Sequence, residues 1–591
     1  MGGPVSVGYT PPSMSADAPA LRYPALGRLL AHPRFVWVVV GVCLLLGLAS
    51  LGNGLLADDL MHYQFLSAHR AGRSEAAWWD MFVLVEHDPR RTIGMRTSGR
   101  YPWWVDPNLR IAFFRPLSAA THHLDFWLWP NSPGLMHAHS VVWHAGACAM
   151  AWAVARRLSS DPRVAGLAAI FYALSFTHVV PWSWLAHRNG LVSTFWALAC
   201  LLAHIRWRSD RKWIAGVVAP GLLGAALLSA EGAVVTLAFL VSYELLVSKG
   251  RLRSRLLALT PALVTVAAWR VVYKLLGYGA LGSGGYIDPI ADPLNFLLAL
   301  PARCGSLIAL SVSPPFIPDL PLWLWAASAF GVGIAALVFV LSPDSKRGAA
   351  RFGLLAASLG CLPLAASFPV DRLLVLTSFG MSLVFAELVD GALLRRAGAA
   401  RTLGAAWVGV IHLVVPTLAD PYVSSHLEAV LLVHSDAHGP DLPGEGLKRK
   451  GLIIVHTPDY PAADKLAANR ARRGLSVPNF VWILHSGPAE PELECVDESS
   501  VVVREPEFGW PVGGFAVQFR NTRATPFRVG DTVRTVDYTA EITEVEDGQP
   551  TAVRFQFRAR LDHESFVWAT WDEGEFVWMK RGPSCEPSRG G

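Results

Sequence analysis

Charged residues are scarce in this chain. Asp, Glu, Lys and Arg make up 16% of its 591 residues, whereas hydrophobic residues make up 52%; soluble domains carry about 25% charged residues. Together with a mean hydropathy of +0.35, this composition excludes an ordinary soluble protein and predicts a polytopic membrane protein. The formal net charge is only +5, so the composition gives no reason to expect a nucleic-acid partner.

Cysteine is also scarce. The chain has seven cysteines, with no Cys-x-x-Cys pair and no His/Cys spacing typical of a metal site. Five of them lie in apolar runs, where a free thiol behaves as a small hydrophobic side chain: Cys43, Cys148, Cys200, Cys304 and Cys361. Cys495 and Cys585 lie in the polar C-terminal part. They could form a disulfide if that part lies outside the cell, and the sequence leaves both states open.

The N-terminus lacks a signal-peptide layout, and the apolar run after Arg34 is too long for a signal-peptide core. We expect residues 1–34 to be a disordered cytoplasmic tail that leads into a retained first helix. Internal repeats are lacking too, and no tetratricopeptide pattern follows the last apolar run.

Long apolar runs are what the chain has in abundance. Eleven of them, each of about 17–23 residues, match a hydrocarbon core of about 30 Å: 35–56, 136–155, 164–180, 189–206, 213–229, 232–248, 256–276, 321–342, 350–368, 373–394 and 402–419. The run 213–246 would be about 51 Å long as one helix. The chain must therefore turn back within "LSAEGA", which places Glu231 at a membrane face.

Lys and Arg in the short loops fall on one side of the membrane if the N-terminus is cytoplasmic. The loop 57–112 is then external. The segment 294–312 has two interpretations. If it crosses the membrane fully, the chain has twelve spans. If it is a re-entrant or interfacial segment within an external region 277–320, the chain has eleven spans. We favour eleven, because both later basic loops then return to the cytoplasm. The expected fold is a polytopic α-helical transmembrane domain over 35–420 followed by an extracytoplasmic globular domain over 421–591. The bias to Ala, Arg and Gly suggests a bacterial inner membrane.

The region 421–591 is polar and broken by Pro and Gly. Six runs are strand-like and one, "PAADKLAANRARRG", is helical, which predicts a small α+β or β-sandwich-like domain. The strand-like runs are "GLIIVH", "NFVWILHS", "SVVVREP", "GFAVQFRN", "AVRFQFRARL" and "SFVWATW". Its tryptophans (Trp510, Trp568, Trp571 and Trp578) would allow carbohydrate stacking, but a packed strand face fits their alternation better. The stretch 434–441, "HSDAHGPD", has possible metal ligands, although its Gly and Pro favour a linker.

Two adjacent acids, Asp58 and Asp59, stand at the external end of the first span. One aspartate there is explained as a helix N-cap. Two carboxylates repel each other and lose hydration near a membrane surface, so the pair suggests a functional site. The following residues "LMHYQFLSAHR" have an apolar stripe and could lie along the interface as a helix.

The downstream motifs, in order and spacing, resemble the GT-C glycosyltransferase superfamily, and most closely its transmembrane O-mannosyltransferase-like branch, here without the tetratricopeptide repeats. The resemblance covers roughly residues 35–395. The matched positions are the acidic pair Asp58-Asp59, the RPL motif Arg115-Pro116-Leu117, the histidines His137 and His144, the loop residues His178, Trp184 and Arg188, the glutamate Glu231, and Asp371-Arg372 in place of Glu-Arg. The sequence departs from the family pattern at Ser140, Val180, Ala230 and Val375.

The resemblance implies transfer of a sugar from a polyprenyl- or dolichyl-phosphate donor to a hydroxyl of a glycan or protein acceptor on the external face. Asp58 is then the expected base, and Asp59 an orienting partner or the ligand of a possible divalent metal (Mg or Mn). Donor-phosphate candidates are Arg115, Arg188 and Arg372, and pocket candidates are His62, His137, His178, Glu231 and Asp371.

Plainer roles fit many of these residues. Arginines at the ends of apolar runs often reach to lipid headgroups. Histidines seven residues apart on one helix face often make polar contacts between membrane helices, and Glu231 could cap a turn. Two other functions stay open: an inactive membrane scaffold with an external binding domain, and a secondary transporter. The transporter is disfavoured, because the chain lacks the repeated broken helices of that class.

Overall fold

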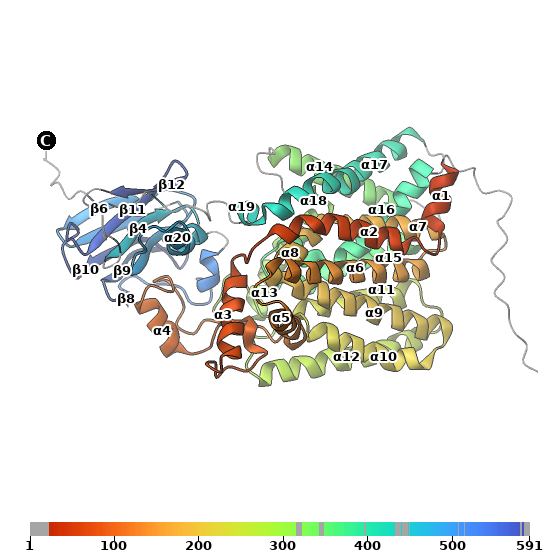
Figure 1. The fold of residues 1–591 in the computed structure, drawn as a ribbon, viewed down its shortest axis with the longest axis horizontal. Coiled ribbons are helices and arrows are strands. Elements are labelled where there is room, and N and C mark those ends of the chain that lie inside the picture. Colours follow the sequence, from red (N-terminus) through yellow and green to blue (C-terminus); the bar gives the residue numbers. More distant parts are fainter. Residues whose placement is uncertain are drawn as a thin grey trace, which may run out of the picture.

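Figure 1 shows a bundle of roughly parallel helices with a β-rich domain at one end. The computed structural model describes residues 23–314, 322–341, 348–394, 398–431, 439, 447, 450–505, 507–512, 515–579 and 582–583. The end of the bundle that carries the β-rich domain is called the domain end below, and the other the far end. Helix-rich architecture with a β-rich C-terminal domain is confirmed. The stretch 434–441 lies outside the described residues except for Gly439.

The bundle contains the predicted spans and two further helices. One, Pro24–Ala31, lies where a disordered tail was predicted, and the other, Pro293–Val312, matches the ambiguous segment. The helices of the bundle are α1 (Pro24–Ala31), α2 (Val36–Gly47), α6 (Pro133–Leu158), α7 (Pro162–Ala173), α9 (Arg188–Asp210), α10 (Trp213–Leu227), α11 (Thr236–Leu246), α12 (Leu252–Leu275), α13 (Pro293–Val312), α14 (Leu322–Leu341), α15 (Gly348–Leu364), α16 (Thr377–Val389), α17 (Ala399–Gly409) and α18 (Val415–Ser425), with the short α19 (Leu427–Leu431) after them. Each of the eleven predicted spans overlaps one or two of these helices, and the chain turns back between α10 and α11 as expected.

Four described helices are by themselves long and apolar enough to cross a membrane: Leu185–Asp210, Leu252–Leu275, Pro293–Val312 and Arg401–Ser425. Two bent pairs raise the number to six if each pair is one span: Pro24–Ala31 with Val36–Gly52, and Pro162–Ala173 with Phe176–Ser183. Large apolar side chains such as Trp37, Leu275 and Phe330 are 70–80% exposed on the bundle surface, as expected where lipid replaces water. The chain is a multi-pass membrane protein, and the number eleven stays a prediction.

Short elements cover the domain end of the bundle. They are the 3-10 turns η1 (Leu48–Gly52), η2 (Asp80–Phe82), η3 (Phe176–His178), η4 (Leu185–His187), η5 (Glu231–Val235) and η6 (Asp371–Leu374), and the helices α3 (Asp58–Arg70), α4 (Pro89–Thr97), α5 (Pro116–Leu128) and α8 (Val179–Ser183). A three-stranded antiparallel sheet, β1 (Val83–Val85), β2 (Arg110–Ala112) and β3 (Gly279–Leu281), joins the two predicted external loops. α3 is a helix as predicted, and it lies across the bundle end in Figure 1.

The C-terminal domain contains two sheets and one helix, α20 (Tyr460–Arg472). One sheet is antiparallel in the order β6 (Glu492–Asp497), β7 (Ser500–Arg504), β10 (Gln549–Phe557), β9 (Tyr538–Glu546), β8 (Thr532–Arg534). The other is mixed, in the order β12 (Glu575–Met579), β11 (Phe566–Asp572), β4 (Gly451–Thr457), β5 (Phe480–Ser486), with the β4–β5 and β4–β11 pairs parallel. Five of the six predicted strands are present.

The sixth predicted strand, "GFAVQFRN", is wrong. Its described part forms the 3-10 turn η9 (Ala516–Phe519). The carbonyls of this turn bond to external loops of the bundle instead of to a neighbouring strand: Ala516 O accepts from Trp104 Nε1 at 3.1 Å, Phe519 O from Asp106 N at 2.9 Å, and Val517 O from Gly284 N at 2.9 Å. Its alternating side chains therefore face a docking surface.

The first external loop and the C-terminal domain share one core. Trp103 and Trp104 of the loop are 2% and 0% exposed, and they pack among the strands of the C-terminal domain. Trp103 Nε1 donates to Leu484 O at 3.0 Å. The predicted C-terminal domain begins at residue 421. Two residues of its core, Trp103 and Trp104, therefore lie outside the predicted domain.

Trp568 of β11 is buried in the same core, which supports the packed-strand interpretation for this tryptophan. Trp510 is buried there too, but it lies between β7 and η9 and not on a strand. Cys495 is disulfide-bonded; Cys585, the partner named from the sequence, lies outside the described residues.

Candidate active site

The acidic pair begins α3 at the domain end of the bundle. Asp59 is 2% exposed. Its Oδ2 accepts from Leu56 N at 3.0 Å, and its Oδ1 accepts from Ala186 N in η4 at 2.7 Å. Burial raises the pKa of Asp59 to about 7, against the effect of these two hydrogen bonds. Asp59 thus joins the end of the first span to the turn before α9.

The residue before the pair is held in a rare conformation. Ala57 has a φ angle of +42°, which costs a non-glycine residue about 1–3 kcal/mol and persists only when its surroundings fix it. Leu56 supplies that constraint, because its N–H donates to Asp59 and its carbonyl accepts from Trp184 Nε1 at 3.2 Å. The strained turn sets the direction of Asp58.

Asp58 is the uncommitted member of the pair. It is partly exposed, and among the described residues its carboxylate makes no hydrogen bond and no ion pair. Burial raises its pKa above the usual value, while the positive charges of Lys465 and Arg372 lower it. Lys465 lies on α20, so a residue of the C-terminal domain acts on the predicted base.

Arg372 lies in η6, just before α16. Its guanidinium lies 5.5 Å from the ring centre of Trp184 and 5.9 Å from that of Phe368, and within the described chain it has no carboxylate partner. Its backbone N–H donates to Asp371 Oδ1 at 2.6 Å, so Asp371 orients the turn. Burial raises the pKa of Asp371. Of the three predicted phosphate-binding arginines, Arg372 is the one whose guanidinium is left available.

Arg115 and Glu231 form an ion pair at the same end of the bundle. Arg115 Nη2 lies 2.8 Å from Glu231 Oε2, and the two side chains are 17% and 23% exposed. The guanidinium also lies 4.4 Å from the ring centre of Phe113. Glu231 Oε1 is buried without a hydrogen-bond partner, so the pair keeps one acceptor free.

Tyr286 was missed by the sequence analysis. It packs edge-on against Phe113 and Phe368, with ring centres 5.5 and 5.6 Å apart. Burial raises its pKa, the charges of Arg372 and Arg115 lower it, and those of Asp58 and Glu231 raise it. Tyr286 follows three glycines in an external loop that the sequence left without structure, and Lys465 is on a helix about 400 residues after Asp58. No local pattern marks either residue.

Arg188 is placed where it cannot meet a donor. The side chain is 0% exposed, and its guanidinium forms an ion pair with Asp125. It also donates to Ser140 Oγ at 2.8 Å and to Met136 O at 2.7 Å. Arg188 therefore joins α9 to α5 and α6, and its guanidinium is engaged within the protein, so we do not carry its predicted phosphate role into the proposal. Ser140, at the family's asparagine position, is one of its partners.

The predicted pocket histidines hold the framework of the site. His137 Nε2 contacts Gly54 O at 3.2 Å, just before the acidic pair. His178 Nδ1 contacts His144 Nε2 at 3.2 Å inside the bundle. This is a polar contact between helices, the plainer role that the sequence analysis named for His144. His62 is 4% exposed and packs edge-on against Phe82, and burial lowers its pKa to about 3. His62 is therefore neutral at ordinary pH and cannot supply a positive charge.

In the described part of the chain, one group of three metal-binding side chains has its ligand atoms within 4.8 Å of one another: Cys43, His144 and Cys148. It is buried between α2 and α6, away from Asp58 and Asp59. His144 and Cys148 are four residues apart on one helix face, a spacing that the sequence analysis overlooked. Asp59 has both carboxylate oxygens engaged by backbone N–H groups, so nothing at the acidic pair confirms the possible Mg or Mn ion.

An apolar groove of about 350 Å³ lies between α13, α14, α15 and α16. Its lining includes Val312, Leu337, Leu354, Thr377 and Met381. Thr377 begins α16, five residues after Arg372 in the 3-10 turn η6. The groove is therefore lined by the first residue of the helix that follows Arg372.

No protein-family model and no curated protein matches the sequence. Similar solved structures include the archaeal oligosaccharyltransferase AglB from Archaeoglobus fulgidus, in complex with an inhibitory peptide and a dolichol-phosphate, at 12% identity and a TM-score of 0.40. That match covers 76% of this chain and 64% of AglB, so the chain spans less than two thirds of that protein. ArnT from Cupriavidus metallidurans, bound to undecaprenyl phosphate, matches at 14% identity and a TM-score of 0.37, over 73% of this chain and 84% of ArnT. These TM-scores are too low to assign a fold family, so the case for function rests on the residues of the site.

Proposed function

We propose that the chain is a GT-C-type membrane glycosyltransferase that uses a polyprenyl- or dolichyl-phosphate sugar. The observation that carries this proposal is a carboxylate without a partner in the described chain, Asp58, within electrostatic reach of the equally unpaired guanidinium of Arg372. Arg372 stands five residues before Thr377, which begins α16 and lines an apolar groove. The ordered motifs of the sequence support the same class. The acceptor is a hydroxyl of a glycan or protein on the face that carries the C-terminal domain.

In the proposed reaction, Asp58 takes the proton of the acceptor hydroxyl as its oxygen bonds to the anomeric carbon of the donor sugar. The bond between that carbon and the phosphate oxygen breaks, with inversion at the anomeric carbon. The lipid phosphate leaves with the extra negative charge, and Arg372 stabilises it as a two-pronged donor. Tyr286 and the Arg115–Glu231 pair line the space for the sugar.

Asp59 is proposed as a positioning residue. Its bonds to Leu56 N and Ala186 N fix the strained turn from which Asp58 projects. The reaction as proposed needs no metal, and a Mg or Mn ion at Asp59 stays a separate proposal. Its test is whether a chelator lowers transfer and added Mg²⁺ or Mn²⁺ restores it.

The proposed topology has eleven spans, with the N-terminus cytoplasmic and the C-terminal domain extracytoplasmic, as in a bacterial inner-membrane protein. The disulfide-bonded state of Cys495 supports an oxidising compartment for that domain. Eleven spans are supported by contacts in which α13 enters the membrane without crossing it. Arg303, in the middle of α13, donates to Ala365 O at 3.0 Å at the domain end. Val312, at the C-terminus of α13, lies beside Gly333 in the middle of α14.

The direct test of function is transfer by the Asp58→Asn variant, in nanodiscs, across a panel of polyprenyl-phosphate sugars. We expect transfer to fall by about 10²–10⁴-fold, the usual contribution of a general base, with unchanged expression and thermal stability. Glu75→Gln is the matched control, because Glu75 is an exposed acid of the same external loop. Undiminished transfer by Asp58→Asn removes Asp58 from the mechanism.

An inactive scaffold is the second candidate. The departures from the family pattern at Ser140, Val180, Ala230 and Val375 favour it. Wild-type protein that transfers from no member of the donor panel, while its C-terminal domain captures a glycan or protein, would support the scaffold and contradict the enzyme.

A further inference from the structure

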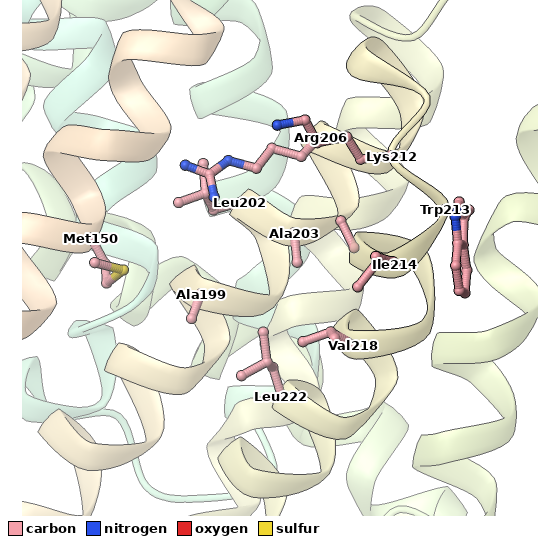
Figure 2. A pocket seen from close by; sticks show the side chains of 11 residues that line it. Met150, Ala199, Leu202, Ala203, Arg206, Lys212, Trp213, Ile214, Val218 and Leu222 are labelled. Carbon is pink, nitrogen blue, oxygen red and sulfur yellow. The ribbon is translucent and has the colours of Figure 1, made fainter.

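A second groove lies at the far end of the bundle. It has a volume of about 580 Å³ and is formed by α9 and α10, with Met150 of α6 at one side. α9 begins at the domain end with Arg188. The groove follows α9 from Ala199 to Arg206, about 16 to 27 Å along the helix from Arg188. Figure 2 shows the lining side chains. The groove is therefore separate from the proposed transfer reaction.

The mouth of the groove is basic. Arg206 and Lys212 are exposed lining residues, and their side chains extend in the same direction in Figure 2. The nearest carboxylate, Asp210, accepts two hydrogen bonds from Arg157, at 3.1 and 2.7 Å. Neither Arg206 nor Lys212 forms an ion pair within the described chain. The mouth thus carries excess positive charge.

Below the mouth the lining is apolar. On α9 it includes Leu202 and Ala199, and on α10 Val218 and Leu222. From Arg206 to Ala199 the groove follows α9 for about 10 Å. One leaflet of a bilayer with a hydrocarbon core of about 30 Å is about 15 Å deep, so the apolar part fits within a single leaflet.

The flank of the groove is typical of a membrane interface. Trp213 is 71% exposed and Ile214 60% exposed, as for an indole at headgroup depth beside a lipid-facing residue. The cations, the indole and the apolar channel follow one another in the order of a lipid's headgroup, glycerol region and acyl chain. A soluble phosphate would leave the apolar part empty.

We propose that this groove binds one anionic phospholipid. Its phosphate lies between Arg206 and Lys212, and an acyl chain lies between α9 and α10 along Ala199 and Val218. Basic pockets between membrane helices select anionic headgroups, and a guanidinium offers two parallel donors to phosphate. The site belongs to the leaflet opposite the proposed active site and does not depend on the proposed function.

The test is native mass spectrometry of the full chain, released from nanodiscs of equal parts phosphatidylglycerol and phosphatidylcholine. We expect retained phosphatidylglycerol to exceed retained phosphatidylcholine at least about tenfold, a difference of about 1.4 kcal/mol. The Arg206→Gln, Lys212→Gln double variant should lose this preference. Arg211→Gln is the matched control, because Arg211 is an exposed neighbouring cation that does not line the groove.

A second variant tests the channel separately from the charges. Ala199→Trp fills the apolar part and leaves both cations in place, so it should also release the lipid. Equal retention of the two lipids by wild type, or equal loss in Arg211→Gln, would overturn the proposal. If undecaprenyl phosphate displaces phosphatidylglycerol at equimolar concentration, the occupant is a prenyl lipid and the phospholipid assignment is wrong.

Discussion

Asp58 and Asp59 are adjacent in sequence but have different surroundings. Asp59 is buried and accepts two backbone N–H bonds, whereas Asp58 is partly exposed and makes none. A base needs an accessible carboxylate, and a positioning residue needs fixed partners. The two roles therefore follow from the surroundings of each residue.

Lys465 gives a pH-dependent test of the base. Its charge lowers the pKa of Asp58, which burial raises. A base must be ionised to accept a proton. In Lys465→Met the acid limb of the pH–rate profile should therefore shift to higher pH, and the transfer rate at acidic pH should fall. Arg473→Gln, an exposed cation just after α20, should keep the wild-type profile. An acid limb at the wild-type pH in Lys465→Met would show that the charge of Lys465 does not act on the base.

Asp59 gives a pH-dependent test of stability. Its pKa in the folded protein is about 7, above the value of about 3.9 for an unfolded aspartate. The unfolded chain therefore releases this proton first, and Asp59 destabilises the fold progressively as pH rises from about 4 to about 7. The melting temperature of wild type minus that of Asp59→Asn should fall over this range and level off above it. A difference that rises with pH would mean that Asp59 is stabilised as an anion.

The resemblance to the GT-C motif series predicted the acidic pair, the RPL arginine and the Asp371-Arg372 turn as parts of one site. It could not rank the arginines. In the sequence, Arg188 and Arg372 are both arginines beside predicted spans. Only the packed structure shows that Arg188 is paired with Asp125, whereas Arg372 has no carboxylate partner in the described chain. Tyr286 and Lys465 needed the tertiary fold.

At the level of elements, the arginine that begins α9, Arg188, and the arginine in η6, Arg372, differ in their partners. Removing one partner of a buried ion pair costs about 3–5 kcal/mol, because the other charge is left unpaired. Arg188→Met should therefore lower the melting temperature markedly. Arg372→Met should lower transfer with little change in melting temperature. Equal loss of stability in both variants would contradict the assignment of Arg372 to the substrate.

The contact of α15 with α16 depends on glycine. A Cβ added at Gly380 would lie 2.4 Å from Gly353 O, closer than any real contact, and close backbone approach through small residues is common between membrane helices. Gly380→Ala should separate the two helices, lower the melting temperature and reduce transfer, since α16 follows Arg372 and lines the apolar groove. Gly409→Ala in α17, where a Cβ meets nothing within 4 Å, is the control and should have neither effect.

The elements themselves were largely predictable. Every predicted span overlaps one or two helices, and five of six strands are present, because apolar periodicity is a local property. The η9 segment failed, because its alternation serves contacts with external loops of the bundle. The number of spans could not be derived from hydropathy, because α13 is long and apolar enough to cross a membrane but ends beside the middle of α14.

For the whole molecule, the first external loop and the C-terminal domain act as one unit. Trp103 is buried in the domain core and donates to Leu484 O. Trp103→Ala should lower the free energy of unfolding of that core by about 3–5 kcal/mol. The C-terminal domain should then be held less firmly, and Lys465 should no longer be kept near Asp58. Limited proteolysis should then release the C-terminal domain, and transfer should fall. Val577→Ala, at a 44% exposed position of the same domain, is the control. Full transfer after domain release would show that the domain is dispensable.

The most direct test of the account is a cryo-EM structure of the full chain with bound undecaprenyl phosphate. The account predicts phosphate oxygens within about 3 Å of the Arg372 guanidinium, the prenyl chain in the groove between α13 and α16, and the Asp58 carboxylate facing the phosphate across a space for one sugar. A phosphate bound away from Arg372, with Asp58 directed into bulk solvent, would contradict it.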